Sequence, residues 1–197
     1  MDQQGVDRRK RRFLTAATSL VWGAATAAAA VPFVASLFPS ARARAAGAPV
    51  EFGLANLAPG ELKVIEWRGK PVWVMRRTGE MLSAIRRSDI QVSDPRSTVP
   101  QQPPYAKNEF RSIEPAIMVL VGVCTHLGCS PQLKPASAKA EMGPAWNGGF
   151  YCPCHGSKFD LAGRVLRGSP APTNLVVPPY RLADGDKVII GETAERA

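Results

Sequence analysis

The chain has 197 residues, of which 45% are hydrophobic, which is enough for one modest domain and an additional segment. Its formal net charge of +9 would suit a nucleic-acid-binding protein, but +5 of it lies in the first 45 residues. The excess of positive charge therefore belongs to the N-terminus, and we expect no nucleic acid as a partner.

Residues 13–38 carry no charge and follow a basic N-terminus, residues 1–12. This stretch is long enough to cross a bilayer core of about 30 Å as one helix, and membrane helices tolerate a proline such as Pro32. More basic residues precede the stretch than follow it, which places the N-terminus in the cytoplasm and the rest of the chain outside. A cleaved secretory signal is the alternative, because residues 41–45 include small residues suited to cleavage. The apolar stretch exceeds the roughly 7–15 residues of a signal's central region, so we expect an uncleaved anchor.

The basic cluster at residues 8–12, followed by Phe13 and Leu14, resembles a twin-arginine export signal. In the usual frame the arginine pair would be Lys10-Arg11, so a plain topogenic charge cluster is the alternative. Both interpretations give the same orientation. Residues 39–49 are rich in alanine and are expected to form a flexible hinge.

Residues 50–197 are expected to form a mainly β domain on the outer, periplasmic side. Strand-like runs at 61–67 and 71–76 flank a short turn and predict a hairpin. Further strands are expected at 117–123, 150–151 and 187–190. The proline-rich stretch 88–111 predicts a long irregular connection to which the sequence assigns no function.

All four cysteines and both histidines lie in two motifs, Cys-Thr-His-Leu-Gly-Cys at 124–129 and Cys-Pro-Cys-His-Gly-Ser at 152–157. Each motif can offer one thiolate and one imidazole to a shared metal centre. The spacings C-x-H and C-x-x-H do not match the usual ligand pairs of a structural zinc site. Two disulfides would account for four cysteines but leave both histidines unexplained. The pattern favours a [2Fe–2S] centre with a cysteine pair on one iron and a histidine pair on the other.

The two motifs closely resemble those of the Rieske iron–sulfur family, in the branch found in cytochrome bc complexes. The resemblance implies a fold of antiparallel sheets with a small cluster-binding subdomain, at about residues 122–172. It also implies roles for the motif residues: iron ligation by Cys124, Cys152, His126 and His155, and a disulfide between Cys129 and Cys154.

The resemblance extends to residues around the motifs. Gly128 and Gly156 are where the loops would wrap tightly around the cluster. The hydroxyl of Ser157 would bond a bridging sulfide and raise the redox potential, although an ordinary turn serine is the alternative. Phe159 stands where many relatives carry a tyrosine, so that hydrogen-bond donor is absent.

Residues 168–172, Gly-Ser-Pro-Ala-Pro, resemble the proline loop that covers the cluster, with Ser169 where relatives often carry glycine. Pro170 belongs to this loop, for which a rigid surface turn is the alternative. Leu127 is expected to be exposed near the histidines, as an apolar contact for a partner protein.

The function that the resemblance implies is that of a redox subunit of a quinol–cytochrome c reductase in the cell inner membrane. Quinol bound in cytochrome b would donate a hydrogen bond to His155 or His126 and pass on one electron and a proton. The head would deliver the electron to a c-type cytochrome, within a complex expected to be dimeric.

Two alternatives remain. A soluble Rieske ferredoxin usually lacks both the extra cysteine pair and an anchor, whereas the small Rieske subunit of a periplasmic oxidoreductase, such as arsenite oxidase, would have a cleaved signal.

Overall fold

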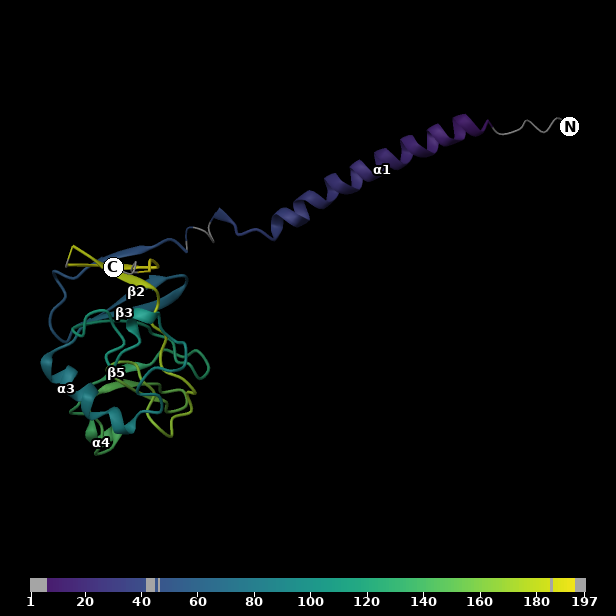
Figure 1. The fold of residues 1–197 in the computed structure, drawn as a ribbon. Helices are drawn as coiled ribbons and strands as arrows, with labels where there is room; N and C mark the ends of the chain where they lie inside the picture. The colour runs from purple at the N-terminus through teal and green to yellow at the C-terminus, as the bar shows by residue number, and fades with distance from the viewer. Residues whose placement is uncertain (1–6, 42–44, 46, 185, 194–197) are drawn as a thin grey trace. The chain divides into compact units, whose positions relative to one another are not determined.

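The computed structural model describes residues 7–41, 45, 47–184 and 186–193 (Figure 1). The chain divides into two compact units, Met1–Ala45 and Ala46–Ala197. The first six residues, and residues 42–44 and 46 of the expected hinge, lie outside the described residues.

The first unit contains one long helix, α1, which spans Arg8–Ser36. It begins before the apolar stretch because the Asp7 carboxylate caps it, accepting the backbone N–H groups of Arg9 and Lys10 at 2.9 and 3.3 Å. The helix is long and apolar enough to cross a membrane. The spanning segment at 13–38 stays a prediction. In the expected hinge, Ala41 and Ala45 are helical, so this segment is not irregular throughout.

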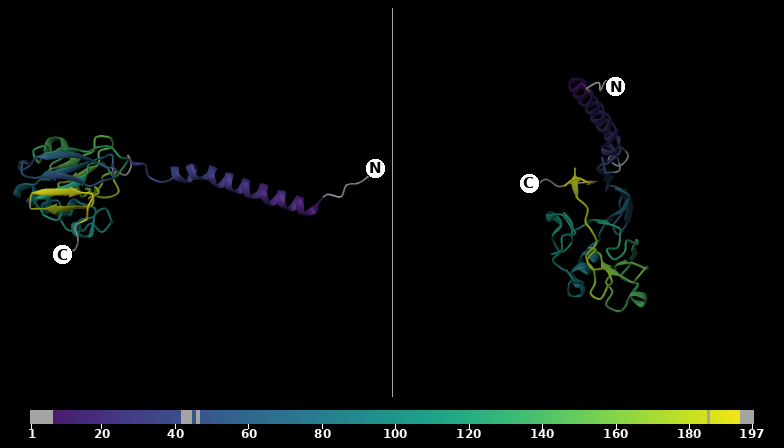
Figure 2. Two further views of the ribbon diagram at one scale, coloured as in Figure 1. Left: turned by 90° about the horizontal axis from the view of Figure 1, so that it is seen from above. Right: turned by 90° about the vertical axis from the view of Figure 1, so that its right-hand side faces the viewer.

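The second unit is built from three antiparallel sheets of three strands each. One sheet has the order β1 (Val50–Gly53), β9 (Lys187–Ile190), β8 (Tyr180–Ala183). The next has the order β2 (Leu62–Trp67), β3 (Lys70–Arg76), β4 (Ile117–Val121). The third has the order β5 (Gln132–Lys134), β6 (Gly149–Tyr151), β7 (Lys158–Asp160). The expected mainly β class is confirmed, and Figure 2 shows the yellow C-terminal strands forming one side of this unit.

The expected hairpin is formed by β2 and β3. Trp67 pairs with Lys70, so the turn consists of Arg68 and Gly69 alone, with φ angles of 52° and 68°. Strand β4 adds to β3 on its other side and is buried along its whole length. It ends at Val121, two residues earlier than expected, and leads into the first motif.

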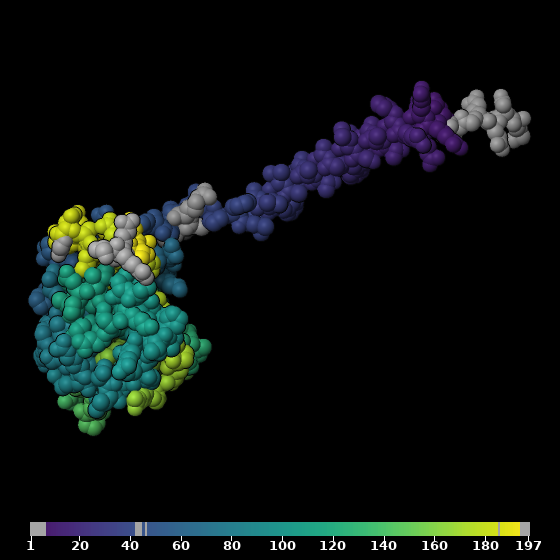
Figure 3. All heavy atoms as spheres, viewed as in Figure 1, coloured from purple at the N-terminus to yellow at the C-terminus, as the bar shows by residue number. Residues whose placement is uncertain are grey.

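The sequence did not predict the helices of the second unit. Helix α3 (Gly79–Arg87) begins after Thr78, whose hydroxyl oxygen accepts the N–H of Met81. Within residues 88–111 the structure has only two short 3₁₀ helices, η1 (Asp89–Gln91) and η2 (Pro104–Ala106). Helix α4 (Lys139–Met142) follows β5. The face seen in Figure 3 is formed largely by the teal part of the chain, which includes α3 and the connection after it.

An aromatic pair joins the sheet of β3 to the small sheet of β6. The rings of Trp73 and Phe150 stack with centroids 4.7 Å apart, and both side chains are buried. The small sheet, which carries the second motif, is thereby packed directly on the larger core.

Candidate metal centre

The two motifs form two loops at strand ends. The first loop, residues 124–129, follows β4, and the second loop, residues 152–157, connects β6 to β7. Cys129 of the first loop and Cys154 of the second are joined by a disulfide, with Cα atoms 6.6 Å apart. Two regions separated by more than twenty residues are thus linked covalently.

The two loops share one pattern of backbone hydrogen bonds. In the first, the N–H of Cys124 donates to the carbonyl of Cys129, and the N–H of Gly128 donates back to the carbonyl of Cys124, at 2.7 and 3.0 Å. In the second, Cys152 bonds to Ser157 and Gly156 bonds to Cys152 in the same way, at 2.8 and 2.9 Å. Each loop is therefore closed by hydrogen bonds between its own residues.

The fifth position of each loop requires glycine because of its conformation. Gly128 and Gly156 have φ angles of 86° and 79°, in the left-handed region that side chains disfavour. A Cβ atom at either position would meet no atom within 4 Å. Lack of space is therefore not the reason for glycine at these positions.

Loops with the same backbone hydrogen bonds present different side chains at matching positions. The third position holds His126 in one loop and Cys154 in the other, and the fourth holds Leu127 and His155. The two histidines therefore come from non-equivalent positions, yet their rings meet edge to face with centroids 4.7 Å apart.

The remaining cysteines and the histidines fit a metal centre. Cys124 and Cys152 are free and buried, with 3% and 1% of their surface exposed. Nδ1 of His126 is buried, and it has no hydrogen-bond partner among the described residues. An unsatisfied buried nitrogen is costly, and ligation of a metal would satisfy it. The donor set of two thiols and two imidazoles is that of a Rieske cluster.

The sulfur atoms of Cys129, Cys152 and Cys154 lie within 4.8 Å of one another. Because two of these sulfurs form the disulfide, this trio is not itself a ligand set. It shows instead that the disulfide packs against the free thiol of Cys152. Burial raises the pKa of that thiol, while hydrogen bonds from the N–H groups of Cys154 and His155 act in the opposite direction.

The segment 168–173, here called the cover loop, lies against both cluster loops. The N–H of Ala171 donates to Oγ of Ser157 at 3.0 Å, and Oγ1 of Thr125 donates to the carbonyl of Thr173 at 2.7 Å. Pro170 is exposed. The two motifs and the cover loop therefore form one assembly.

One edge of this assembly is open to solvent. His155 is exposed, whereas His126 is only partly exposed. Leu127 has 70% of its surface exposed, as the sequence predicted. The second loop thus presents the accessible imidazole of His155, and the first loop presents the apolar side chain of Leu127.

The turn after the second loop is enclosed by buried arginines that the sequence did not single out. Arg77 donates to the carbonyl of Leu161, and Arg111 donates to the carbonyls of Ala162 and Gly163. Burial lowers the pKa of both guanidinium groups to about 10, so both are charged at neutral pH. No local sequence signal could identify them, because these carbonyl partners lie more than fifty residues away.

Residues 88–111, which had no expected role, hold this region in place. Arg164 contacts Asp89 at 2.5 Å, and Arg167 donates to the carbonyl of Val92. Asn174 donates to the carbonyl of Asp94. The irregular connection therefore holds the chain that follows the second loop in place through these contacts.

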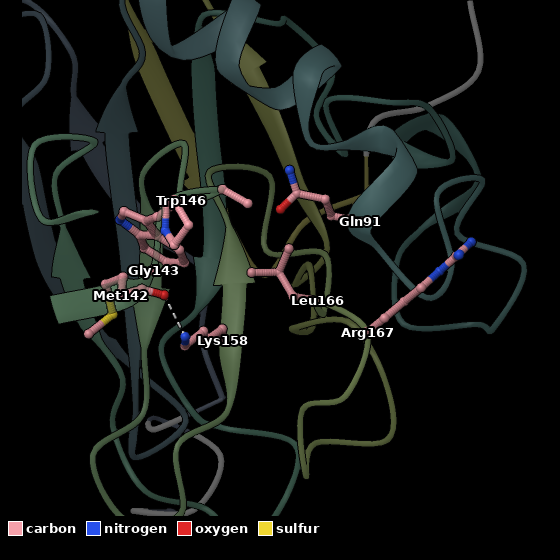
Figure 4. Close-up of a pocket in the computed structure, with 9 residues that line it drawn as sticks. Gln91, Met142, Gly143, Trp146, Lys158, Leu166 and Arg167 are labelled. Carbon is pink, nitrogen blue, oxygen red and sulfur yellow. Dashed lines mark hydrogen bonds between the residues drawn. The ribbon is translucent and has the colours of Figure 1, made fainter. Parts of the chain in front are cut away.

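A cavity of about 360 Å³ lies beside β7 (Figure 4). Lys158 reaches across it and donates to the carbonyl of Met142 at 2.7 Å. Trp146, Leu166 and Arg167 contribute to its walls. No residue of either cluster loop lines this cavity, so it is distinct from the candidate metal centre.

Comparisons with known proteins agree with this geometry. Residues 52–181 match the family model of the Rieske [2Fe-2S] domain, which confirms the expected class of cofactor. Residues 1–40 match a model described as "Ubiquitinol-cytochrome C reductase Fe-S subunit TAT signal".

Relatives match over nearly the whole chain. The ubiquinol–cytochrome c reductase iron–sulfur subunit of Allochromatium vinosum is 54% identical over 98% of this chain and 93% of its own. The Rieske subunit of the mitochondrial cytochrome b-c1 complex of Saccharomyces cerevisiae is 35% identical, over 91% and 74%. A solved chain of a hyperthermophilic respiratory complex III is 26% identical over 86% of this chain and 98% of its own, with a TM-score of 0.46. The chain belongs to the Rieske iron–sulfur subunits of ubiquinol–cytochrome c reductase, a redox enzyme complex.

Proposed function

We propose that this chain carries electrons from quinol to a c-type cytochrome as the membrane-anchored Rieske subunit of its complex. The observations that carry the proposal are two free, buried cysteines, one in each loop, and two histidines, also one in each loop, whose rings lie 4.7 Å apart. Helix α1 would anchor the chain in the inner membrane, with the N-terminus in the cytoplasm and residues 50–197 in the periplasm.

In this proposal Cys124 and Cys152 bind one iron, and His126 and His155 bind the other. When bound, the cluster accepts and releases one electron at a potential between about −150 and +300 mV. Neutral imidazoles would place less negative charge on their iron than thiolates would, which favours the reduced state. The buried, unpartnered Nδ1 of His126 supports ligation through that nitrogen.

The residues at the open edge would receive the quinol. His155 is the more exposed of the two imidazoles, so we assign it the hydrogen bond from the quinol hydroxyl and the accompanying proton. His126 is the second candidate. Leu127 and Pro170, both exposed, would make apolar contacts with cytochrome b, which completes the quinol site. The complex is expected to be dimeric.

Low-temperature EPR of reduced membranes that contain the chain tests this function, with and without a quinol-site inhibitor. We expect a rhombic signal with the low average g value of mixed histidine–cysteine ligation, and a change of its shape by the inhibitor. A Rieske signal that the inhibitor leaves unchanged would favour a soluble carrier or a periplasmic oxidoreductase instead. The absence of the signal, together with zinc in metal analysis, would overturn the proposal.

A further inference from the structure

The cover loop has no regular secondary structure of its own, and its two prolines lack backbone N–H groups. Its burial alternates along the chain: Ala171 is buried, Ser169 and Thr173 are partly buried, and Pro170 and Pro172 are exposed. One face of the cover loop is therefore directed at the protein. Every second residue, Ser169, Ala171 and Thr173, lies on this face and contacts the cluster loops or β7.

Side-chain hydroxyls make these attachments. Ser157 receives the N–H of Ala171, and Thr125 holds the carbonyl of Thr173. The third hydroxyl belongs to the cover loop itself: Oγ of Ser169 accepts the N–H of Lys158 at 3.1 Å and donates to the carbonyl of the same residue at 3.2 Å.

The Ser169 contact acts on the peptide group that joins Ser157 to Lys158. At one end of this peptide group the carbonyl of Ser157 accepts the N–H of Cys152 at 2.8 Å. At the other end the N–H of Lys158 donates to Ser169. The orientation of Ser157 relative to Cys152 is thus fixed from both sides.

The hydroxyl of Ser157 is completely buried, and it accepts one hydrogen bond while donating none among the described residues. Its proton is therefore available to an acceptor at the metal centre. A hydrogen bond to a cluster sulfur stabilises the reduced, more negative state, so its strength depends on the direction of this O–H group.

We propose that Ser169 is a positioning residue that sets the redox potential through Ser157, by holding the N–H of Lys158. This inference rests on the proposed function, because it requires the cluster between the two loops. Lys158 is held elsewhere too, since its Nζ binds the carbonyl of Met142 across the cavity of Figure 4, and its carbonyl accepts the N–H of Leu166 at 2.9 Å. Loss of the Ser169 hydroxyl therefore loosens one peptide group and leaves the strand in place.

The test compares redox potentials of the loaded, full-length chain in membranes, by EPR-monitored titration. We expect Ser169→Ala to lower the potential by less than Ser157→Ala does. Ser169→Thr keeps a hydroxyl and should retain the original potential. Ser83→Ala is the matched control, because this hydroxyl also donates to a backbone carbonyl, at 3.0 Å, but within α3.

The double variant Ser157→Ala/Ser169→Ala separates positioning from a general effect on structure. If Ser169 acts through Ser157, the double variant has the potential of Ser157→Ala alone. Additive shifts, or an unchanged potential in Ser169→Ala, would overturn the inference. Should the alanine variant fail to load the cluster, Ser169→Gly is measured in its place and is expected to show the same lowered potential.

Hydrogen exchange gives a second readout on the same samples. The peptide that contains Lys158 should exchange faster in Ser169→Ala than in Ser169→Thr, because its N–H has lost its acceptor. If the unmodified chain itself gives no Rieske signal, the proposed function fails. A normal signal with equal potentials in all Ser169 variants defeats only the inference about Ser169.

Discussion

Asp160 and Arg164 form an ion pair that the protein encloses. Oδ2 of Asp160 lies 2.8 Å from Nε of Arg164, and the two side chains are 2% and 0% exposed. The other carboxylate oxygen accepts the backbone N–H groups of Ala162 and Arg164. One carboxylate therefore fixes the turn directly behind the second loop.

Replacement of Asp160 by asparagine should be strongly destabilising. It leaves a buried guanidinium without its buried counter-charge, and breaking a buried pair costs about 3–5 kcal/mol. The free energy of unfolding in denaturant measures the effect. Asp89→Asn is the control, because this second partner of Arg164 is 54% exposed and its loss should cost less. Equal losses in the two variants would contradict this account.

The stability should depend on Asp94 in acid. Partial burial raises the pKa of Asp94, but hydrogen bonds from the N–H groups of Thr98 and Val99 and from the Thr98 hydroxyl outweigh it, so the pKa lies below its usual value. A lowered pKa in the folded state adds stability that is present above the unfolded pKa, at about 3.9, and is lost as the pH falls through the folded pKa. Unfolding measured between pH 6 and pH 2 should show a smaller loss in Asp94→Asn than in the unmodified chain. Parallel curves would refute the assignment.

Ser157→Ala should lower the redox potential of the cluster. A hydrogen bond to a charged group contributes about 1.5–3 kcal/mol, which corresponds to about 60–130 mV for one electron. EPR-monitored titration measures the shift, with Ser83→Ala as the control. An unchanged potential would identify Ser157 as an ordinary turn residue that only receives the N–H of Ala171.

Phe159→Tyr should raise the potential. Phe159 is fully buried in β7, and a hydroxyl added to its ring would supply the donor that the family resemblance implies at this position. Protein-film voltammetry gives the value. Phe52→Tyr, in β1 of another sheet, is the control and should leave the potential unchanged. No difference between the two variants would mean that the new hydroxyl does not reach the cluster.

The disulfide should stabilise the folded chain. It joins residues 25 positions apart, for which chain-entropy arguments give about 3.5 kcal/mol. The variant Cys129→Ala/Cys154→Ala should therefore unfold at lower denaturant concentration. A reductant should bring the unmodified chain to the same midpoint and leave the variant unchanged. A reductant that destabilises both equally would act elsewhere, for example on the cluster.

The sequence sufficed where the signals are local. The two motifs contain every cysteine and histidine, so the candidate ligands could be recognised without the fold. The hairpin of β2 and β3 was predicted because its strands and turn are adjacent. Helix α3 had local signals that were not used, namely the capping Thr78 and the basic residues Arg86 and Arg87 in its last turn.

The residues that support the loops could not be predicted in this way. Arg111 and Arg77 bind carbonyl groups 51 to 84 positions away, and such contacts exist only once the chain has folded. The sequence shows a serine at position 169, where the family resemblance implies glycine. It does not show that the hydroxyl of this serine accepts the N–H of Lys158. His155 is more exposed than His126, and neither spacing nor composition reports this difference in burial.

The matching backbones of the two loops have a consequence for the order of events during biogenesis. Each loop is closed by bonds between its own first, fifth and sixth residues, so its shape requires no oxidant. Disulfides form and persist mainly in oxidising compartments and are rare in the cytoplasm. The shape of each loop can therefore form before the bond between Cys129 and Cys154, which then joins two loops that are already formed.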